Sequence, residues 1–274
     1  MTQPIWRESP QTGVEMREAQ KRRIVAGIMT VAAAVIVSGS AVPASTADDA
    51  REPQQARAAA VFRLSFDNGE SLRPGTRALD TTGHRHHATV VVSDGGRLTR
   101  ERGVVRRAAG FPSACGTCGR ALLEIMDRAA ALDPRRRDFQ FGASVRVTPR
   151  QAPDGLGLDP NLVQKRLYNE RGGQFKLELL GSRPRCVIAG RKGRVTTPRG
   201  ESIADGRWHS VQCVRRGPVV RVRVDGRTVA EASGPTGWLA SSAPVRIGGK
   251  AVGPSGQNDQ FHGDLDSVFL TFLR

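Results

Sequence analysis

An alternation of apolar and polar residues with a period of two constrains the fold of this chain more than any other feature. It occurs at residues 139–147, 175–179 and 220–224. This pattern is typical of β-strands that place one face in a core and the other in solvent. Asp225-Gly226 follows the third run and tolerates the positive φ angles of a tight hairpin, so we expect the chain to return directly as another strand.

Strand-like segments at 245–247 and 265–272 complete a series of short strands separated by glycine-containing turns. Such a series, with few helix-length periodic segments, predicts an all-β sandwich or jelly roll of antiparallel sheets. Hydrophobic residues make up 38% of the chain and charged residues 25%, which excludes a disordered protein. A chain of 274 residues can hold the sandwich as a single domain.

Residues 1–47 have the order of regions found in secretory signal peptides. Basic residues precede an uncharged apolar run at 24–37, and small residues follow, so we expect cleavage after Ala44 or Ala47. An uncleaved membrane anchor is the alternative, because about 20 apolar residues span a bilayer. Both interpretations place the domain that follows outside the cell, since the basic residues precede the apolar run.

The domain organisation follows from this segment. Residues 48–60 are polar and alanine-rich without a strand pattern, so we expect a disordered linker before a sandwich domain at 61–274. Met16 would open a signal segment of ordinary length, which leaves Met1 and Met16 both as candidate starts. We expect a secreted protein that contacts the membrane only if its signal segment stays uncleaved.

The net charge of +16 raises the question of nucleic-acid binding. Only five of the 42 basic residues are lysines, and the arginines are scattered among acidic residues along the chain. Residues 1–47 hold five basic and three acidic residues, so the rest keeps 37 and 23, a net charge of +14. We expect no nucleic-acid partner, and a positive domain of this kind favours anionic glycans or cell-wall polymers.

Four cysteines follow the signal segment, which favours disulfides in an exported chain. Of the three possible pairings we predict Cys186–Cys213 with Cys115–Cys118. The strand-like surroundings of Cys186 and Cys213 suggest neighbours in one sheet, and Gly116 eases the tight loop between the other two. A four-thiolate zinc site and a redox pair are the alternatives, disfavoured by the wide spacing and the missing βαβ context.

Four motifs occur in order in the C-terminal part: Asp-Gly-Arg-Trp-His at 205–209, Val-Asp-Gly at 224–226, Pro-Val-Arg-Ile-Gly-Gly at 244–249 and Phe-His-Gly-Asp-Leu-Asp at 261–266. With the segments 64–69 and 80–88, they resemble laminin G-like domains of the concanavalin A-like lectin/glucanase superfamily, of the secreted actinobacterial type. The resemblance covers 62–274 and implies a concanavalin A-like jelly-roll sandwich of two antiparallel sheets, preceded by an N-terminal signal segment. It also implies a strand at 121–125, where propensity alone favours a helix.

The resemblance further implies a structural Ca²⁺ ion, which needs several oxygen ligands. The candidate ligands are Asp67, Asp80 and Asp266, which come together if the first and last strands of the domain pair. The sequence departs from the family pattern at Asn68 and Ser267, where Glu and Asp are common. The alternative is that the three carboxylates cap turns or satisfy backbone donors.

Two further groups of residues are candidates for functional sites. His84, His86 and His87 lie close together, but the resemblance places them in a solvated loop rather than in a ligand set. Trp208 and His209 belong, by the same resemblance, to the packing of a strand in the core.

The superfamily includes glucanases, whose retaining chemistry needs two carboxylates about 5 Å apart. Their strand motif E-x-D-x-x-E is absent here, so we expect a non-catalytic extracellular module that binds carbohydrate or another cell-envelope polymer. Trp238 and Tyr168 lie outside the expected core strands and are the candidate stacking residues. A structural or protein-binding adhesion module and a glycan hydrolase or lyase of the same fold stay open, as does the oligomeric state.

Overall fold

A computed structural model describes residues 60–113, 119–152, 159–252 and 258–274. Every regular element in these ranges is a β-strand, and the strands form two antiparallel sheets. The predicted signal or anchor segment and the predicted linker lie outside the described residues, apart from Ala60, where β1 begins. No helix among the described residues is long and apolar enough to cross a bilayer.

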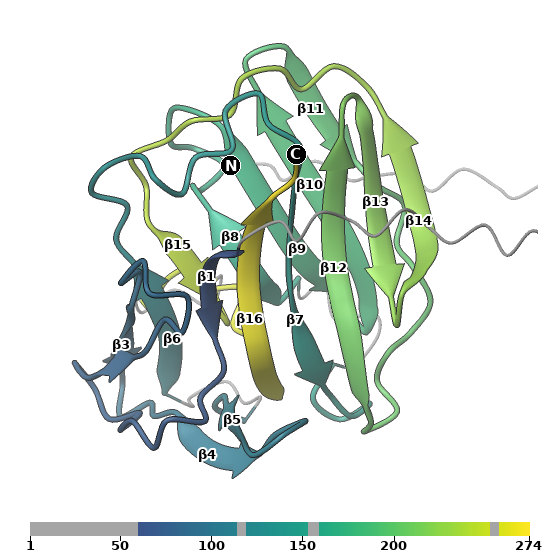
Figure 1. Cartoon of the computed structure of the whole chain (residues 1–274). Coiled ribbons are helices and arrows are strands. Elements are labelled where there is room, and N and C mark those ends of the chain that lie inside the picture. Colours follow the sequence, from purple (N-terminus) through teal and green to yellow (C-terminus); the bar gives the residue numbers. More distant parts are fainter. Residues whose placement is uncertain (1–59, 114–118, 153–158, 253–257) are drawn as a thin grey trace, which may run out of the picture. The chain divides into compact units, whose positions relative to one another are not determined.

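The two sheets face each other as the layers of a jelly-roll sandwich (Figure 1), as the sequence predicted. Sheet A contains, in spatial order, β14 (Arg227–Ser233), β13 (Val219–Val224), β12 (Trp208–Arg216), β7 (Phe139–Arg146), β16 (Asp264–Phe272), β5 (Arg107–Gly110) and β4 (Thr99–Arg102), with β1 (Ala60–Leu64) paired to β16. Sheet B contains β11 (Gly193–Thr196), β10 (Arg183–Gly190), β9 (Gln174–Leu180), β8 (Asn161–Lys165), β15 (Val245–Ile247), β6 (Arg120–Ile125), β3 (Ala88–Ser93) and β2 (Arg77–Ala78).

The first and last strands of the domain pair with each other, with Leu64 opposite Val268. β16 also pairs with β7 along its length and with β5 at its start. The C-terminal strand therefore lies inside sheet A, between elements from the beginning and the middle of the chain (Figure 1).

β7 shows how the alternating pattern builds the core. Its apolar side chains are buried between the sheets, while Gln140, Ser144 and Arg146 point to the opposite, outer face and stay partly exposed. The ring centroid of Phe141 lies 4.7 Å from that of Phe175 on β9, so aromatic contacts join the two sheets directly. Such aromatic pairs stabilise the fold beyond the effect of buried area alone.

Two local predictions are confirmed. Asp225 and Gly226 have φ angles of +49° and +81° and form the turn between β13 and β14. Residues 120–125 form β6, a strand that pairs with both β3 and β15, rather than a helix. Pairing on both sides and nearly complete burial outweigh the helix propensity of this segment.

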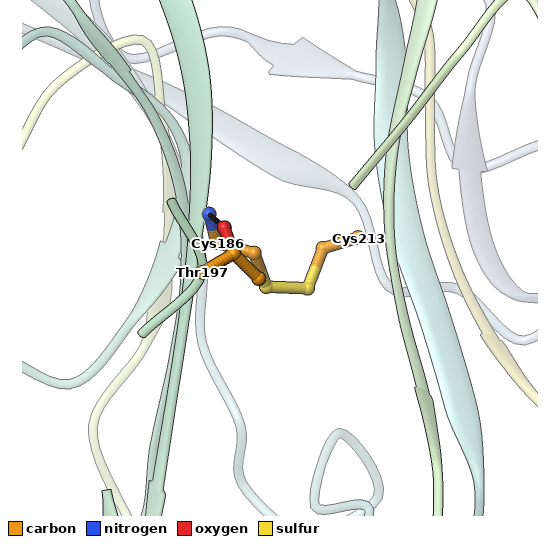
Figure 2. Close-up of a disulfide and its surroundings, with 3 residues drawn as sticks. All are labelled: Cys186, Thr197 and Cys213. Carbon is orange, nitrogen blue, oxygen red and sulfur yellow. Dashed lines mark hydrogen bonds between the residues drawn. A yellow bond between two sulfur atoms is a disulfide. The ribbon is translucent and has the colours of Figure 1, made fainter. Parts of the chain in front are cut away.

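The disulfide Cys186–Cys213 is confirmed, but its place in the fold differs from the expectation. Cys186 lies on β10 of sheet B and Cys213 on β12 of sheet A, so the bond crosses the core and joins the two layers (Figure 2). The two Cα atoms are 5.8 Å apart, and both side chains are fully buried. Strand-like surroundings alone could not distinguish two partners in one sheet from two partners in facing sheets. Cys115 and Cys118 lie outside the described residues.

A buried ion-pair network connects β8 with the loop after β6. The ammonium group of Lys165 lies 2.5 Å from a carboxylate oxygen of Asp127 and 3.3 Å from one of Asp133. The three side chains are between 0% and 3% exposed. Removing one partner of such a network would leave an uncompensated buried charge, which is strongly destabilising. The intact network therefore holds this loop against the sheet.

Replacing Cys186 and Cys213 together by Ala should lower the free energy of unfolding by about 3 kcal/mol, because the bond closes a loop of 27 residues in the unfolded chain. Urea unfolding of the oxidised protein and of the double variant measures the difference. An unchanged unfolding midpoint would contradict a structural role for the bond.

Candidate binding site on the outer face of sheet A

A shallow groove of about 330 Å³ runs across the outer face of sheet A. It lies over β12, β7 and β16 and is bordered by β1. The lining side chains are mainly hydroxyls and amides: Gln140, Ser144, Ser210, Gln212, Ser267 and Thr271, with Ala60, Arg63, Ala143 and Phe269. Arg63 is the only residue in this lining that carries a charge.

The groove follows from strand register. Ser210 of β12 lies opposite Ser144 of β7, and Thr271 of β16 lies opposite Gln140 of β7. Because side chains alternate between the two faces of a strand, the apolar neighbours of these residues enter the core and leave the polar ones outside. The amide of Gln212 donates a hydrogen bond to the hydroxyl of Ser210 at 3.1 Å, which orients the two side chains.

A β-bulge in β16 shapes the end of the groove. The register of β16 against β7 shifts between Asp266 and Phe269, and Ser267 adopts a φ angle of +49°. Bulges of this kind re-aim side chains next to binding sites. The shift places Phe269 and Thr271 on the outer face, where the guanidinium carbon of Arg63 lies 5.6 Å above the Phe269 ring.

A second hollow, of about 520 Å³, is lined by residues of β4, the end of β5 and the start of β16. Its floor is Gly110, where an added Cβ would meet the Thr99 hydroxyl at 2.4 Å and an Asp264 carboxylate oxygen at 3.2 Å. Burial raises the pKa of Asp264, and the hydrogen bond from Arg146 at 2.8 Å only partly offsets this effect. This hollow could not be predicted from the sequence, because it depends on which strands are neighbours.

The predicted calcium ligands divide into a pair and a single residue. The Asp266 carboxylate accepts a hydrogen bond from the Val104 amide at 2.8 Å, and the Asp67 carboxylate accepts one from the Arg107 amide at 3.0 Å. Burial raises the pKa of Asp266 and the nearby Asp67 charge adds to the rise, against hydrogen bonds that lower it. These two carboxylates thus meet at the β4–β5 turn.

Asp80 lies at a separate turn. Its carboxylate accepts hydrogen bonds from the amides of Arg63, Thr82 and His86, each at 3.0 Å. Burial raises the pKa of Asp80, but these hydrogen bonds outweigh burial and lower it overall. The carboxylates of Asp80 and Asp266 therefore both accept hydrogen bonds from backbone amides.

Within the described ranges, no group of three or more His, Cys, Asp or Glu side chains is arranged to hold a metal ion. The carboxylates of Asp67, Asp80 and Asp266 do not form such a set, and His87 accepts a hydrogen bond from the Asp80 amide at 3.0 Å. Calcium binding stays a prediction of the family resemblance.

Trp238 and Tyr168 lie in loops beside sheet B and do not line the groove. Tyr168 is 79% exposed, with the Arg194 guanidinium 4.9 Å above its ring, whereas Trp238 is half-buried under Arg135. The amide of Gly173 donates to the carbonyl of Ala240, so the loops that carry the two aromatic residues adjoin. Their role in ligand stacking stays a prediction.

Trp208 and His209 lie on β12, as expected, but not in the core. Trp208 shares a cross-strand row with Arg146, whose guanidinium stacks 4.9 Å from the indole ring on the outer face. The His209 imidazole bridges two carboxylates, Asp225 at 2.8 Å and Asp205 at 3.0 Å. Trp208 and His209 therefore stabilise the start of β12 through a cation–π contact and ion pairs, rather than through apolar packing in the core.

This arrangement predicts a pH-dependent stability. Burial lowers the pKa of His209, but the hydrogen bonds and charges of Asp225 and Asp205 outweigh it and raise the pKa above its usual value. The stabilisation is therefore fully present below about pH 6.5 and is lost as the pH rises through the raised pKa. Chemical unfolding between pH 6 and 8 should show a loss of at most about 1 kcal/mol, because both carboxylates are exposed. His209→Gln should remove this slope, and an identical slope in the variant would refute the assignment.

The fold is a jelly-roll sandwich that carries a groove on the outer face of sheet A. The family described as Laminin G domain matches residues 162–271, which run from the second residue of β8 to the last residue but one of β16. A search of curated protein sequences finds no significant match to the chain.

Solved structures share the fold at low sequence identity. The binding domain of Paraclostridial Mosquitocidal Protein 1 has a TM-score of 0.56 at 14% identity, over 77% of this chain and 48% of that one. The binding domain of botulinum neurotoxin DC in complex with SialylT has a TM-score of 0.51 at 10% identity, over 78% and 48%. The chain thus spans about half the length of these proteins.

Domain 4 of AbnA, a GH43 extracellular arabinanase from Geobacillus stearothermophilus, was solved in complex with arabinotriose. It has a TM-score of 0.51 at 16% identity, over 79% of this chain and 95% of that one. At these identities the likeness establishes the shared architecture.

Proposed function

We propose that the protein is an extracellular, non-catalytic module that binds a carbohydrate or another cell-envelope polymer along the outer face of sheet A. The observation that carries the proposal is the groove of hydroxyl and amide side chains over β12, β7 and β16. Such groups both donate and accept hydrogen bonds, which suits the hydroxyls of a neutral sugar chain. The groove is open and shallow, so an extended polymer can lie along it.

The comparisons support the class of ligand without fixing its identity. Similar jelly-roll domains include one solved with arabinotriose and one solved with SialylT. The signal segment predicted from the sequence would deliver the module to the envelope polymers outside the cell. At one side of the groove the Arg63 guanidinium lies over the Phe269 ring, and a sugar ring that displaced the arginine could stack there.

Binding to a glycan array, measured with and without a chelator, tests the proposal and the calcium prediction together. The double variant Ser210→Ala/Gln212→Ala should bind any glycan hit about tenfold more weakly, because it removes two side chains that each form hydrogen bonds. Glu231→Gln on β14, whose side chain pairs with Arg221 outside the groove, is the control and should bind as the wild type does.

Three outcomes would overturn the proposal. Absence of glycan hits combined with a protein partner captured from culture supernatant would favour the adhesion module. Release of reducing ends from a polysaccharide would establish an enzyme. Glycan binding that the double variant retains in full would place the site elsewhere on the domain.

A further inference from the structure

The turn between β4 and β5 carries an unusual pair of residues. The Gly103 amide donates to the Arg106 carbonyl at 3.2 Å across the short loop of this hairpin, which has Val104 and Val105 at its centre. The two residues are 53% and 74% exposed. Gly, Pro, Asn, Asp and Ser dominate such positions, so two exposed valines at a turn have no explanation in local backbone preference.

The turn is held firmly by the carboxylates below it. Asp266, which is 1% exposed, accepts the Val104 amide, and Asp67 accepts the Arg107 amide. A side chain at Gly103 would collide with the Asp266 carboxylate, at 2.7 Å, so the turn lies directly on β16. The valines are therefore presented to solvent by an anchored hairpin, and they cannot easily fold back onto the domain.

Positive charge surrounds this apolar tip. Arg102, Arg106 and Arg107 flank the two valines and are all exposed, and none of their guanidinium groups forms an ion pair within the described ranges. A cluster of exposed arginines around an exposed apolar tip suits a partner that is both anionic and partly apolar.

A basic hollow adjoins the same hairpin. It measures about 610 Å³ and is lined by Gly69, Ser71, Leu72, Arg73, Pro74, Arg97, Leu98 and Arg100, with no carboxylate side chain. Arg100 lies on β4, two residues before Arg102. It donates to the carbonyls of Gly69 and Glu70, which fixes its guanidinium at the wall of the hollow. Three arginines and a hydroxyl suit a phosphate group.

We propose that the β4–β5 hairpin docks on an anionic phospholipid membrane, with Val104 and Val105 in the interfacial layer and the surrounding arginines on lipid phosphates. A soluble polyanion would satisfy the arginines but gain nothing from two exposed valines. A bilayer satisfies both, since interfacial binding combines buried apolar area with attraction to anionic headgroups. The residues of this contact do not line the glycan groove.

Co-sedimentation with vesicles tests the inference on the exported protein collected from the medium. Binding is expected to vesicles of phosphatidylcholine with about a third phosphatidylglycerol, and not to phosphatidylcholine alone. Val104→Ser/Val105→Ser should weaken binding about tenfold, because it removes the apolar tip. Arg102→Gln/Arg106→Gln/Arg107→Gln should weaken it on the order of one hundredfold, at about fivefold for each arginine.

The serine variant should keep its thermal stability, because Ser is favoured in turns, and should keep glycan binding in the groove. A failure of membrane binding with glycan binding intact, or the reverse, thus separates this inference from the proposed function. Inorganic phosphate that binds the protein while vesicles do not would overturn the membrane assignment in favour of a free-phosphate site.

Fluorescence quenching tests whether the tip of the hairpin enters the lipid layer. A tryptophan introduced as Val105→Trp should be quenched by brominated anionic lipid, whereas Arg227→Trp at the β13–β14 hairpin, which has no apolar tip, should not. Vesicle binding that the serine variant retains in full, or an unquenched Val105→Trp, would overturn the proposal. Binding through the arginines alone would then indicate a polyanion surface.

Discussion

Much of the structure depends on the position of β16 inside sheet A. The strand pairs with β7, β5 and β1, so the end of the chain must be in place before the sheet is complete. Its inward side chains close the core, while its outward ones serve three separate surfaces. Asp264 lines the hollow over Gly110, Asp266 holds the β4–β5 turn, and Phe269 borders the groove. The bulge at Ser267 separates these surfaces, since it changes which residues face outward.

Asp266 also shows why residues that resemble metal ligands can have another role. Its carboxylate is almost fully buried, and burial raises its pKa, but the Val104 amide donates a hydrogen bond that compensates in part. A buried carboxylate needs such donors, because desolvation without them costs several kcal/mol. Asp67 does the same for the Arg107 amide. Asp67 and Asp266 therefore hold the β4–β5 turn in place, although the local sequence of the turn does not favour it.

The sequence predicted the sheets better than the sites because apolar alternation reports burial directly. It identified β7, β9 and β13, whose inward residues are apolar, and the Asp225-Gly226 turn. It did not identify β4, whose sequence Thr-Arg-Glu-Arg shows no alternation and becomes a strand by pairing with β5. The groove could not be predicted from the sequence either, because Ser144 and Ser210 become neighbours only through the register of β7 and β12. The disulfide partners were predictable, but the sheets that they join were not.

The two proposed surfaces differ in the physics of recognition. The groove contains a single charged side chain, Arg63, so contacts there depend on hydrogen bonds and change little with ionic strength. The hairpin tip and its basic hollow rely on Arg100, Arg102, Arg106 and their neighbours, and exposed charges lose their reach as salt shortens the Debye length to about 8 Å at physiological strength. Salt therefore weakens one surface selectively. A domain that uses both can remain on its polymer while its contact with the membrane responds to the ionic surroundings.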